Sequence, residues 1–586
     1  MQLTTRTSHS RQLWLVQLCG LVLALAWTRA GWAGGESPSA LTRESFESTG
    51  EVLVDLDDDV DEVTYKDIFS RLAVEVRPTA LFETTRSFVL RAAPSRMDEL
   101  RRTLERDDRV EIVEPNHRVR VLFEPNDPML GEQWHLKRVN TGRAWDFATG
   151  RGVTVAVVDT GIACESFGPF TKASDLAETK CVSGYDFISR TKEVADDHGH
   201  GTHVAGTIAQ STDNGVGTAG VAFGARLMPV KVLDAMGWGS FATVADGIRF
   251  AADNGANVIN LSLGGPFQSR AVEKAVRYAR QRAVVVIAAA GNSGGSVDYP
   301  GASPHVLGVS ATDPENKLAR FSSRGAGVDI AAPGVGVVQQ SICEGGKNHC
   351  ELFPSWSGTS MASPHVAGTA ALLASMGVTR PDKVEKLLLA TAMKVDDSKE
   401  GRAQFGHGIV DAGAAVTRAA LRKVVARTLS LSLMIFLVFR WARRRGRESL
   451  SPWRPGFLIS ALLTGPGLLF FAPLLLPRTI WFVDLLARPF ADWDLLWSVQ
   501  LHSALPLANV LIPLGVSLLL LNVRGMRGAL AGLCVGTASY LCAEVLLQDL
   551  AFPLGAFALT VWCVINALLC ATLARVILQK SAAGAA

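Results

Sequence analysis

Residues 358–376 of the chain read GTSMASPHVAGTAALLASM, in which small residues surround Ser360 and an apolar run follows. This pattern predicts a buried helix over 360–376, with Ser360 at its N-terminal end and Pro364 in its first turn, where a missing N–H costs little. Such a helix end offers free N–H groups and the positive end of a dipole, which suit a developing oxyanion. Serine is also a common helix cap, so this stretch alone does not separate a nucleophile from a cap.

Composition divides the chain into a polar part and an apolar part. Its 586 residues are enough for two or more domains. Up to about residue 420 the sequence is typical of a soluble protein, whereas the remainder is strongly apolar. The net charge of +3 is small for this length. We therefore expect a globular region, a membrane region and no nucleic-acid partner.

The N-terminus has the pattern of an export signal. Arg6 and Arg11 precede an apolar run over 13–27, and small residues follow near Ala33. The run is short for a membrane span. We therefore expect a signal peptide over 1–33, removed near Ala33, and then a flexible polar segment over 34–50.

Residues 51–125 are predicted to form a small α+β unit. Its expected elements are a strand over 52–56, a helix over 94–104, and two strands over 110–113 and 119–123, separated by Glu114-Pro115-Asn116. The acidic run 57–62 is interpreted as a solvated face. A unit this small has a marginal core, so we expect a partner to stabilise it.

Residues 126–418 alternate between apolar runs and helical patterns. Strands are predicted over 153–158, 226–232, 258–263, 284–290, 306–310 and 328–332, and helices over 201–210, 241–253, 269–282, 360–376 and 381–393. Strands that are apolar on both faces and separated by helices indicate an α/β fold: a doubly wound, mostly parallel sheet with helices on both faces. In such sheets the site lies beyond the carboxyl ends of the strands.

Polar residues follow several of these strands. Asp159 ends the first strand, and Asn292 follows the strand over 284–290. Three histidines, at 198, 200 and 203, lie among glycines at the start of the first helix. No carboxylate or cysteine joins them at a recognisable metal-ligand spacing. An acid, a histidine, an amide donor and a serine at a helix end are the groups that acyl transfer requires.

Three blocks of the sequence resemble the signature blocks of subtilisin-like serine proteases. They are Asp159-Thr160-Gly161, HGTHVAG at 200–206 and GTSMASP at 358–364, in the same chain order. The resemblance covers roughly residues 50–415 and implies a subtilisin-like fold. It further implies that Asp159 orients the base, His200 is the general base and Ser360 is the nucleophile, with Asn292 and the Ser360 N–H holding the oxyanion. His198 and His203 remain as structural neighbours.

The same resemblance implies where substrate lies and how the enzyme matures. Substrate would add as an extended strand between two edges, Gly237-Trp238-Gly239 and Ser262-Leu263-Gly264, beside Ala290 and Gly291. Broad specificity with a preference for apolar residues before the cut is the family expectation. Residues 51–125 are similar to a propeptide, which implies an inhibitor that the enzyme removes by self-cleavage between about 118 and 126.

Four cysteines fall in the polar part: Cys164, Cys181, Cys343 and Cys350. An even number in an exported domain is consistent with two disulfides. Of three connectivities we predict the short-range one, Cys164 with Cys181 and Cys343 with Cys350. Four free thiols would be preferred only if this domain faced the cytosol.

No cofactor is needed for the predicted chemistry, but members of the resembling family often bind structural calcium. Gln133, Asp175 and the loop 212–215 are possible contributors to such a site. The match is loose, and a plain turn is the alternative interpretation of the loop. No other metal ligands are identified.

The apolar C-terminal part, 419–586, is predicted to be an all-α membrane domain. Its candidate spans are 424–441, 457–476, 504–521, 528–547 and 554–578. With five spans, the main arginine and lysine clusters lie on the cytoplasmic side and the protease domain on the opposite side. The loop 478–503 is expected to form an interfacial amphipathic helix. Glu544 and Asn566 are polar within spans, and Glu544 is interpreted as an interfacial carboxylate.

These observations predict a membrane-anchored, extracytoplasmic serine endopeptidase that is made as a self-processing zymogen. Its expected partners are protein or peptide substrates, its own propeptide and a lipid bilayer. One alternative is a silent fold used as a binding module, against which the intact Asp159, His200, Ser360 and Asn292 argue. The other is a membrane sensor or transport-associated protein whose protease domain is regulatory.

Overall fold

A computed structural model describes residues 48–57, 59–72, 74–91, 96–117, 123–342, 352–444, 454–470, 472, 481–504, 509–523 and 525–578. The chain separates into two compact units, residues 38–121 and the remainder. The predicted signal peptide lies outside the described residues, as do most of the segment 34–50 and the start of the region in which self-cleavage is expected.

The smaller unit is a four-stranded antiparallel sheet in the order β2-β3-β1-β4 with helices between its strands. Its elements are β1 (Ser48–Leu56), α2 (Glu62–Ser70), β2 (Glu75–Pro78), α3 (Phe82–Thr85), β3 (Ser87–Arg91), α4 (Met97–Leu104) and β4 (Val110–His117). Val54, Leu56 and Leu90 are fully buried at its centre.

The acidic run 57–62 is largely solvated, as interpreted: Asp59, Asp61 and Glu62 are exposed, and the Asp61 carboxylate also caps α2 by accepting the Thr64 N–H at 2.8 Å. One prediction for this unit requires correction. The strand predicted over 110–113 is longer than expected, since β4 continues through Glu114-Pro115-Asn116 to His117 and Pro115 pairs with Val52. Proline is tolerated there because β4 is an edge strand, which needs only one set of ladder hydrogen bonds. Most of the strand expected over 119–123 lies outside the described residues.

The larger unit contains a seven-stranded parallel sheet in the order β11-β10-β9-β8-β5-β7-β6. Its strands are β5 (Thr154–Asp159), β6 (Tyr185–Asp186), β7 (Arg226–Lys231), β8 (Val258–Leu261), β9 (Val285–Ala289), β10 (Leu307–Thr312) and β11 (Ile330–Pro333). All six residues of β5 are buried. The predicted strands are confirmed apart from their ends, whereas β6 and the hairpin of β12 (Val337–Val338) with β13 (Ser355–Trp356) were not predicted.

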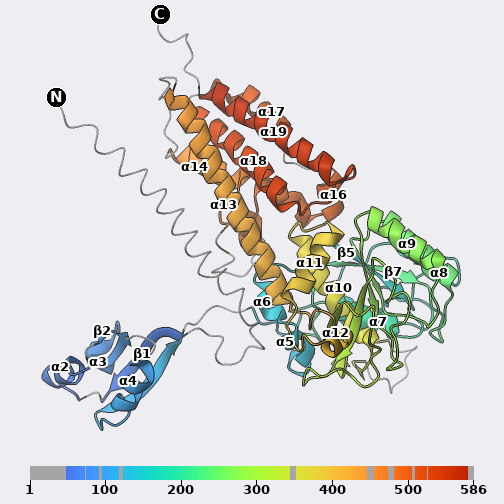
Figure 1. The fold of residues 1–586 in the computed structure, drawn as a ribbon, viewed down its shortest axis with the longest axis horizontal. Helices are drawn as coiled ribbons and strands as arrows, with labels where there is room; N and C mark the ends of the chain where they lie inside the picture. Colours follow the sequence, from blue (N-terminus) through green and yellow to red (C-terminus); the bar gives the residue numbers. More distant parts are fainter. Residues whose placement is uncertain are drawn as a thin grey trace, which may run out of the picture. The chain divides into compact units, whose positions relative to one another are not determined.

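Helices cover both faces of this sheet (Figure 1). The main helices are α7 (His200–Ala209), α8 (Phe241–Asp253), α9 (Arg270–Gln281), α10 (Thr359–Ser375) and α11 (Pro381–Thr391), and the shorter segments are η4 (Leu130–Glu132), α5 (Trp134–Arg138), α6 (Thr141–Trp145), η5 (Ser174–Leu176) and α12 (Lys399–Phe405). Alternate β5 residues point to different cores: Val155 and Val157 to the core that contains α7 and α10, Ala156 and Val158 to the core that contains α8 and α9. The predicted doubly wound fold is confirmed.

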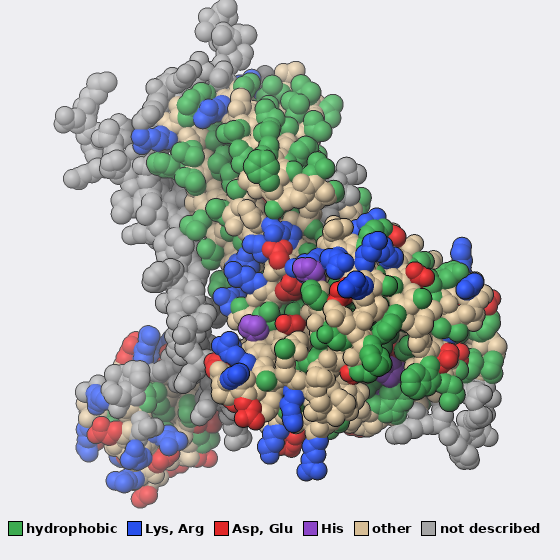
Figure 2. Space-filling model, turned by 45° about the vertical axis from the view of Figure 1, so that its right-hand side comes forward, with side chains coloured by type: hydrophobic (Ala, Val, Ile, Leu, Met, Phe, Trp, Pro, Cys, Tyr) green, Lys and Arg blue, Asp and Glu red, His purple; other side chains and the backbone are tan. Residues whose placement is uncertain are grey.

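The C-terminal helices are α13 (Ala412–Arg444), α14 (Pro455–Thr464), α17 (Leu511–Leu520), α18 (Arg527–Leu547) and α19 (Gly555–Ile577). Among the described residues, 412–441, 527–547 and 555–577 are long and apolar enough to cross a membrane. Figure 2 shows mainly hydrophobic side chains over this region and a mixed charged surface over the part that contains the seven-stranded sheet. Gly532 and Gly536 let α14 approach α18 closely, because an added Cβ would lie 2.3 Å from Phe457 O and 2.1 Å from Thr464 Oγ1.

Two of the five predicted spans differ from continuous helices. The span expected over 457–476 is interrupted, because α14 ends at Thr464 and a turn follows. In the span expected over 504–521, the last part is helical only over Leu511–Leu520. In addition, α13 begins in the core that contains α7 and α10, where Ala412, Ala415, Val416 and Ala419 are buried, and continues without a break. The boundary expected at 418/419 therefore falls inside a helix.

The loop 478–503 is not a single interfacial helix. It contains α15 (Trp481–Ala487), η7 (Phe490–Leu496) and α16 (Val499–Ala504), and its acidic residues Asp484, Asp492 and Asp494 are buried. Burial is tolerated because each carboxylate contacts a buried cation or a histidine. The bonds are Arg488 Nε to Asp484 Oδ1, 2.8 Å, Arg427 Nη2 to Asp492 Oδ2, 2.7 Å, and His502 Nδ1 to Asp494 Oδ1, 2.7 Å.

Glu544 is likewise buried within the protein. Its carboxylate is 1% exposed and lies 3.5 Å from Arg427 Nη2. The segment 484–499 also contacts the core that contains α7 and α10. Leu495 and Val499 belong to that core, and Arg488 Nη1 donates to Ser375 O, near the end of α10, at 2.8 Å. The C-terminal region thus packs directly against the region that holds the seven-stranded sheet, while its helices keep a hydrophobic core of their own.

Candidate active site

Asp159 and His200 meet where β5 ends and α7 begins. His200 Nδ1 lies 2.7 Å from Asp159 Oδ1, which also accepts the Thr160 N–H at 2.8 Å. The Asp159 side chain is fully buried, whereas that of His200 is 21% exposed. Because a carboxylate can only accept, Nδ1 carries the proton and the exposed ring edge presents the Nε2 lone pair. His200 is therefore oriented as a base.

Burial and the carboxylate act in opposite directions on His200. Burial by itself lowers the pKa of this imidazole, but the charge of Asp159 and its hydrogen bond outweigh burial, so the pKa is raised above its ordinary value. A raised pKa makes the imidazole a better proton acceptor, and it means that the ring becomes neutral only at a somewhat higher pH.

Geometry separates His200 from the two neighbouring histidines, in agreement with the role that the family resemblance implied for it. His203 is fully buried, its Nε2 donates to the carbonyls of Val337 and Pro354 at 3.1 and 3.3 Å, and its ring stacks on Trp356. Burial lowers the pKa of His203 to about 3, so it stays neutral. His198 lies beside Gly237, where an added Cβ would be 3.4 Å from its Nε2.

Ser360 is the second residue of α10, and its backbone is held by an unusual contact. Helix α10 begins at Thr359, so Pro364 lies beyond the first turn, contrary to prediction. A proline there cannot donate to the carbonyl four residues earlier, which is Ser360 O. Ser262 Oγ donates to that carbonyl at 2.8 Å instead. The orphaned acceptor is thereby satisfied.

The Ser262 hydroxyl is itself positioned by a buried residue. Asn260 Nδ2 donates to Ser262 Oγ at 2.9 Å, and Ser363 Oγ donates to Asn260 Oδ1 at 2.7 Å. The Ser360 hydroxyl donates to Ser262 O at 3.1 Å, and the described residues contain no hydrogen bond between it and His200. To be deprotonated by His200, Ser360 Oγ must rotate away from this carbonyl.

Asn292 is anchored through its carbonyl oxygen. Thr359 N and Thr359 Oγ1 both donate to Asn292 Oδ1, at 2.8 and 2.9 Å. The amide nitrogen is thereby turned away, and Nδ2 has no partner among the described residues. Because Asn292 and Ser360 line the same pocket, Nδ2 and the first free N–H groups of α10 are donors available to an oxyanion there.

The pocket beside Ser360 is open and has a volume of about 340 Å³. Of the predicted substrate-binding residues it is lined by Leu263, Gly264 and Gly291, together with Asn292. Ser262 lies behind Ser360, and the segment Gly237-Trp238-Gly239 forms a separate turn, with Trp238 76% exposed. Sequence reasoning did not single out the lining residues Ala289, Ser293 and Asp298. Asp298 in particular lies outside every motif.

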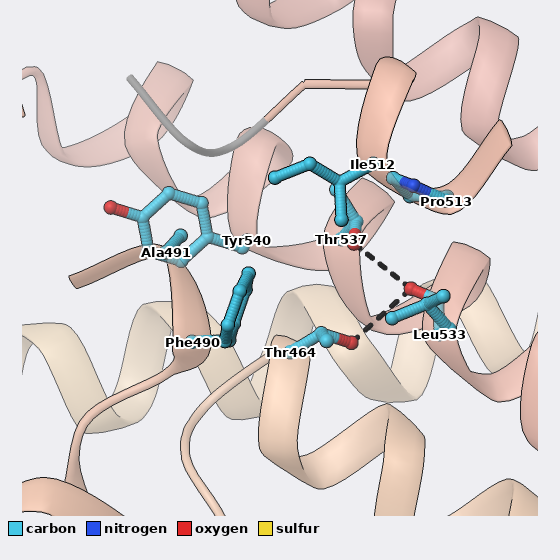
Figure 3. Close-up of a pocket in the computed structure, with 8 residues that line it drawn as sticks. All are labelled: Thr464, Phe490, Ala491, Ile512, Pro513, Leu533, Thr537 and Tyr540. Atoms are coloured by element: carbon cyan, nitrogen blue, oxygen red, sulfur yellow. Dashed lines mark hydrogen bonds between the residues drawn. The ribbon is translucent and has the colours of Figure 1, made fainter. Parts of the chain in front are cut away.

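A second cavity lies among the C-terminal helices and holds none of the predicted catalytic groups. Figure 3 shows its walls, formed by Thr464, Phe490, Ala491, Ile512, Pro513, Leu533, Thr537 and Tyr540. Its volume of about 10 Å³ is enough for roughly one water molecule. The hydroxyls of Thr464 and Thr537 both donate to Leu533 O, so little polarity remains for a ligand.

The residues suggested for calcium are already hydrogen-bonded to N–H groups. Gln133 Oε1 accepts the Ala219 N–H, and the two oxygens of Asp175 accept from Asn214 Nδ2 and Thr218 N. Calcium requires six to eight oxygen ligands. Among the described residues, no three His, Cys, Asp or Glu side chains form a metal-sized group. In this arrangement the residues do not form a calcium cage, and structural calcium here stays a prediction.

Cys164 and Cys181 form a disulfide, with Cα atoms 6.2 Å apart, as predicted. It joins the turn after β5 to the segment that leads to β6. Cys343 and Cys350 lie outside the described residues, so their pairing stays a prediction.

Comparison with known proteins agrees with this geometry. Residues 150–408 match the model of the subtilase family. Thermitase from Thermoactinomyces vulgaris is 42% identical over 257 residues, which are 44% of this chain and 87% of that protein. Thermophilic serine proteinase from Bacillus sp. (strain AK1) is 40% identical over 319 residues, 54% of this chain and 75% of the relative. The chain belongs to the subtilase family and is a subtilisin-like serine peptidase.

Among solved structures, a protease from Pseudoalteromonas arctica PAMC 21717 is 34% identical to this chain. It aligns with a TM-score of 0.45 over 50% of this chain and 99% of its own.

Proposed function

We propose that this chain is a membrane-anchored serine endopeptidase that hydrolyses peptide bonds through Asp159, His200 and Ser360. The observation that carries the proposal is the 2.7 Å hydrogen bond from His200 Nδ1 to the buried Asp159. It fixes the tautomer in which Nε2 is a base, in a peptidase whose serine stands at a helix N-terminus. Substrate would bind as an extended strand along Leu263 and Gly264.

The reaction follows from the positions of these groups. Ser360 Oγ rotates from Ser262 O, gives its proton to His200 Nε2 and attacks the scissile carbonyl carbon. The carbonyl oxygen becomes an oxyanion, to which Asn292 Nδ2 and the Ser360 N–H donate. The imidazolium then gives its proton to the leaving amine, which departs as the C–N bond breaks. Water, deprotonated by His200, cleaves the resulting acyl-enzyme.

Labelling with a fluorophosphonate probe tests the nucleophile. Purified full-length protein should be labelled, and Ser360→Ala should abolish labelling. Ser355→Ala provides a matched control, because Ser355 is an exposed serine five residues earlier in the chain. Labelling that persists in the Ser360→Ala variant would show that another residue reacts.

Membrane anchoring and zymogen processing are further parts of the proposal. Three long apolar helices support anchoring, and the separate unit over 38–121 supports a removable inhibitor. We expect topology reporters fused at Arg447 and Asp549 to report the cytoplasmic and external sides respectively. An external reporter at Arg447 would overturn this orientation. Ser360→Ala should accumulate the longer, unprocessed form, and normal processing in that variant would contradict self-cleavage.

A further inference from the structure

The pocket beside Ser360 contains a carboxylate. Asp298 lines it together with Leu263, Gly264, Ala289 and Gly291. The side chain extends across the two glycines. A Cβ added at Gly291 would lie 2.3 Å from Asp298 Oδ2, and one added at Gly264 would lie 3.2 Å from Asp298 Cβ. Glycine at both positions therefore leaves room for this carboxylate inside the pocket.

The Asp298 backbone is held firmly at this place. Its N–H donates to Ala290 O at 2.9 Å, and its carbonyl accepts the Ala302 N–H at 3.0 Å. The next residue, Tyr299, forms two backbone hydrogen bonds with Gly265, at 2.8 and 2.9 Å. The segment that carries Asp298 is thus tied to both walls of the pocket, to 264–265 on one side and to 289–291 on the other.

The Asp298 carboxylate has no hydrogen-bond or ion-pair partner among the described residues. Burial raises its pKa, and no neighbouring cation opposes that effect. The buried acids Asp484 and Asp492, by contrast, are each paired with an arginine. A half-buried, unpaired negative charge in a binding pocket is costly unless a ligand supplies the opposite charge.

We propose that Asp298 is a specificity-determining residue that selects a lysine or arginine side chain at P1, the residue whose carbonyl is attacked. This inference rests on the proposed function. An extended substrate along Leu263 and Gly264, with its carbonyl at Asn292 and Ser360, directs its P1 side chain between the two walls toward Asp298. In chymotrypsin-fold serine proteases, which have an unrelated fold, an acidic group in the P1 pocket distinguishes enzymes that cut after basic residues from those that cut after apolar ones. The assignment departs from the apolar preference that the family resemblance implies.

The test measures kcat/KM for full-length enzyme in detergent, with peptide p-nitroanilides that differ only at P1. The P1 residues are Lys, Nε-acetyl-Lys and Leu, so the first two differ mainly in charge. Active enzyme is counted with a fluorophosphonate probe. We expect Lys to exceed both neutral residues at least tenfold. Asp298→Asn should lower the Lys-to-Leu ratio by about 30-fold, equivalent to about 2 kcal/mol at 1.4 kcal/mol per factor of ten.

Asp382→Asn is the matched control, since it removes an exposed carboxylate on α11 outside the pocket and should leave the ratio unchanged. If Asp298→Asn does not fold, the Lys-to-acetyl-Lys ratio of the unmodified enzyme decides the question. If labelled enzyme prefers Leu, or if Asp298→Asn changes the Lys-to-Leu ratio less than twofold, the inference about Asp298 is overturned while the proposed function stands. Unlabelled protein would overturn the proposed function as well.

Discussion

Replacing Ser262 by alanine should destabilise the nucleophile helix because Pro364 leaves Ser360 O without a helical partner. The Ser262 hydroxyl donates to Ser360 O at 2.8 Å and accepts from Asn260 Nδ2 at 2.9 Å. Asn260 is fully buried and Ser262 nearly so, which keeps water from replacing either bond. An unsatisfied buried polar group costs about 1–3 kcal/mol. Ser262→Ala leaves two, so we expect a loss of about 2 kcal/mol or more.

Pro364→Ala supplies the means to isolate this contact. The substitution restores a backbone N–H that can bond to Ser360 O within the helix. In that background Ser262→Ala leaves only the Asn260 amide unpaired. The cost of Ser262→Ala should then fall by about 1–2 kcal/mol, which is the coupling energy of the double-mutant cycle.

The assay is thermal unfolding of full-length protein in detergent, in a Ser360→Ala background that prevents autolysis and keeps the backbone carbonyl of residue 360. For a domain of this size 1 kcal/mol corresponds to roughly 2 °C. We expect Ser262→Ala to lower Tm by about 4 °C when Pro364 is retained and by clearly less in the Pro364→Ala background. Equal losses in both backgrounds would refute the reasoning, because the carbonyl at 360 would then not depend on Ser262.

Three further predictions concern the base, the oxyanion donor and the buried ion pair. The kcat/KM profile should fall on the acid side at a pH above the ordinary imidazole value of about 6.5, since the pKa of His200 is raised and only its neutral form accepts a proton. Asp159→Asn should move that limb to lower pH and lower kcat severely, and an unmoved limb would contradict the assignment. Asn292→Ala should lower kcat about 10²–10³-fold with little change in KM, which is the loss measured for the equivalent donor of a subtilisin. An effect mainly on KM would mean that Asn292 binds the ground state rather than the oxyanion. Arg427→Met should cost about 3–5 kcal/mol, because Asp492 and Glu544 stay buried and lose the arginine they contact. An unchanged Tm would contradict this role of Arg427, and Arg427→Lys should lose less than Arg427→Met.

Local sequence patterns predicted the catalytic fold well because its elements are long and apolar. The β5 strand is buried on both faces, and its carboxyl end carries Asp159 in a motif with fixed spacing. Asn292 was found the same way. Asp298 was missed because its place in the pocket depends on its contacts with Gly264 and Gly291, which only the folded chain brings next to it.

The C-terminal part was harder to predict for a related reason. Hydropathy does not distinguish an apolar helix in lipid from one that ends early against its neighbours, as α14 does at Thr464. Nor does it show that Asp484, Asp492 and Asp494 are paired with arginines or a histidine. Their charges indicated an aqueous interface, whereas pairing with buried partners permits burial. The position of Pro364 beyond the first turn of α10 likewise depended on a donor from a different part of the chain, Ser262.

The continuous α13 has a consequence for which peptide bonds the enzyme can reach. Its 33 residues run from the catalytic core into the apolar bundle, and at about 1.5 Å per residue they span roughly 50 Å without a flexible joint. Arg488 and Leu495 add contacts beside this helix. In an enzyme anchored as we propose, the active site is therefore held at one height above the lipid surface. Distance from the membrane, as well as side-chain identity, would then decide which bonds of a neighbouring membrane protein are cut.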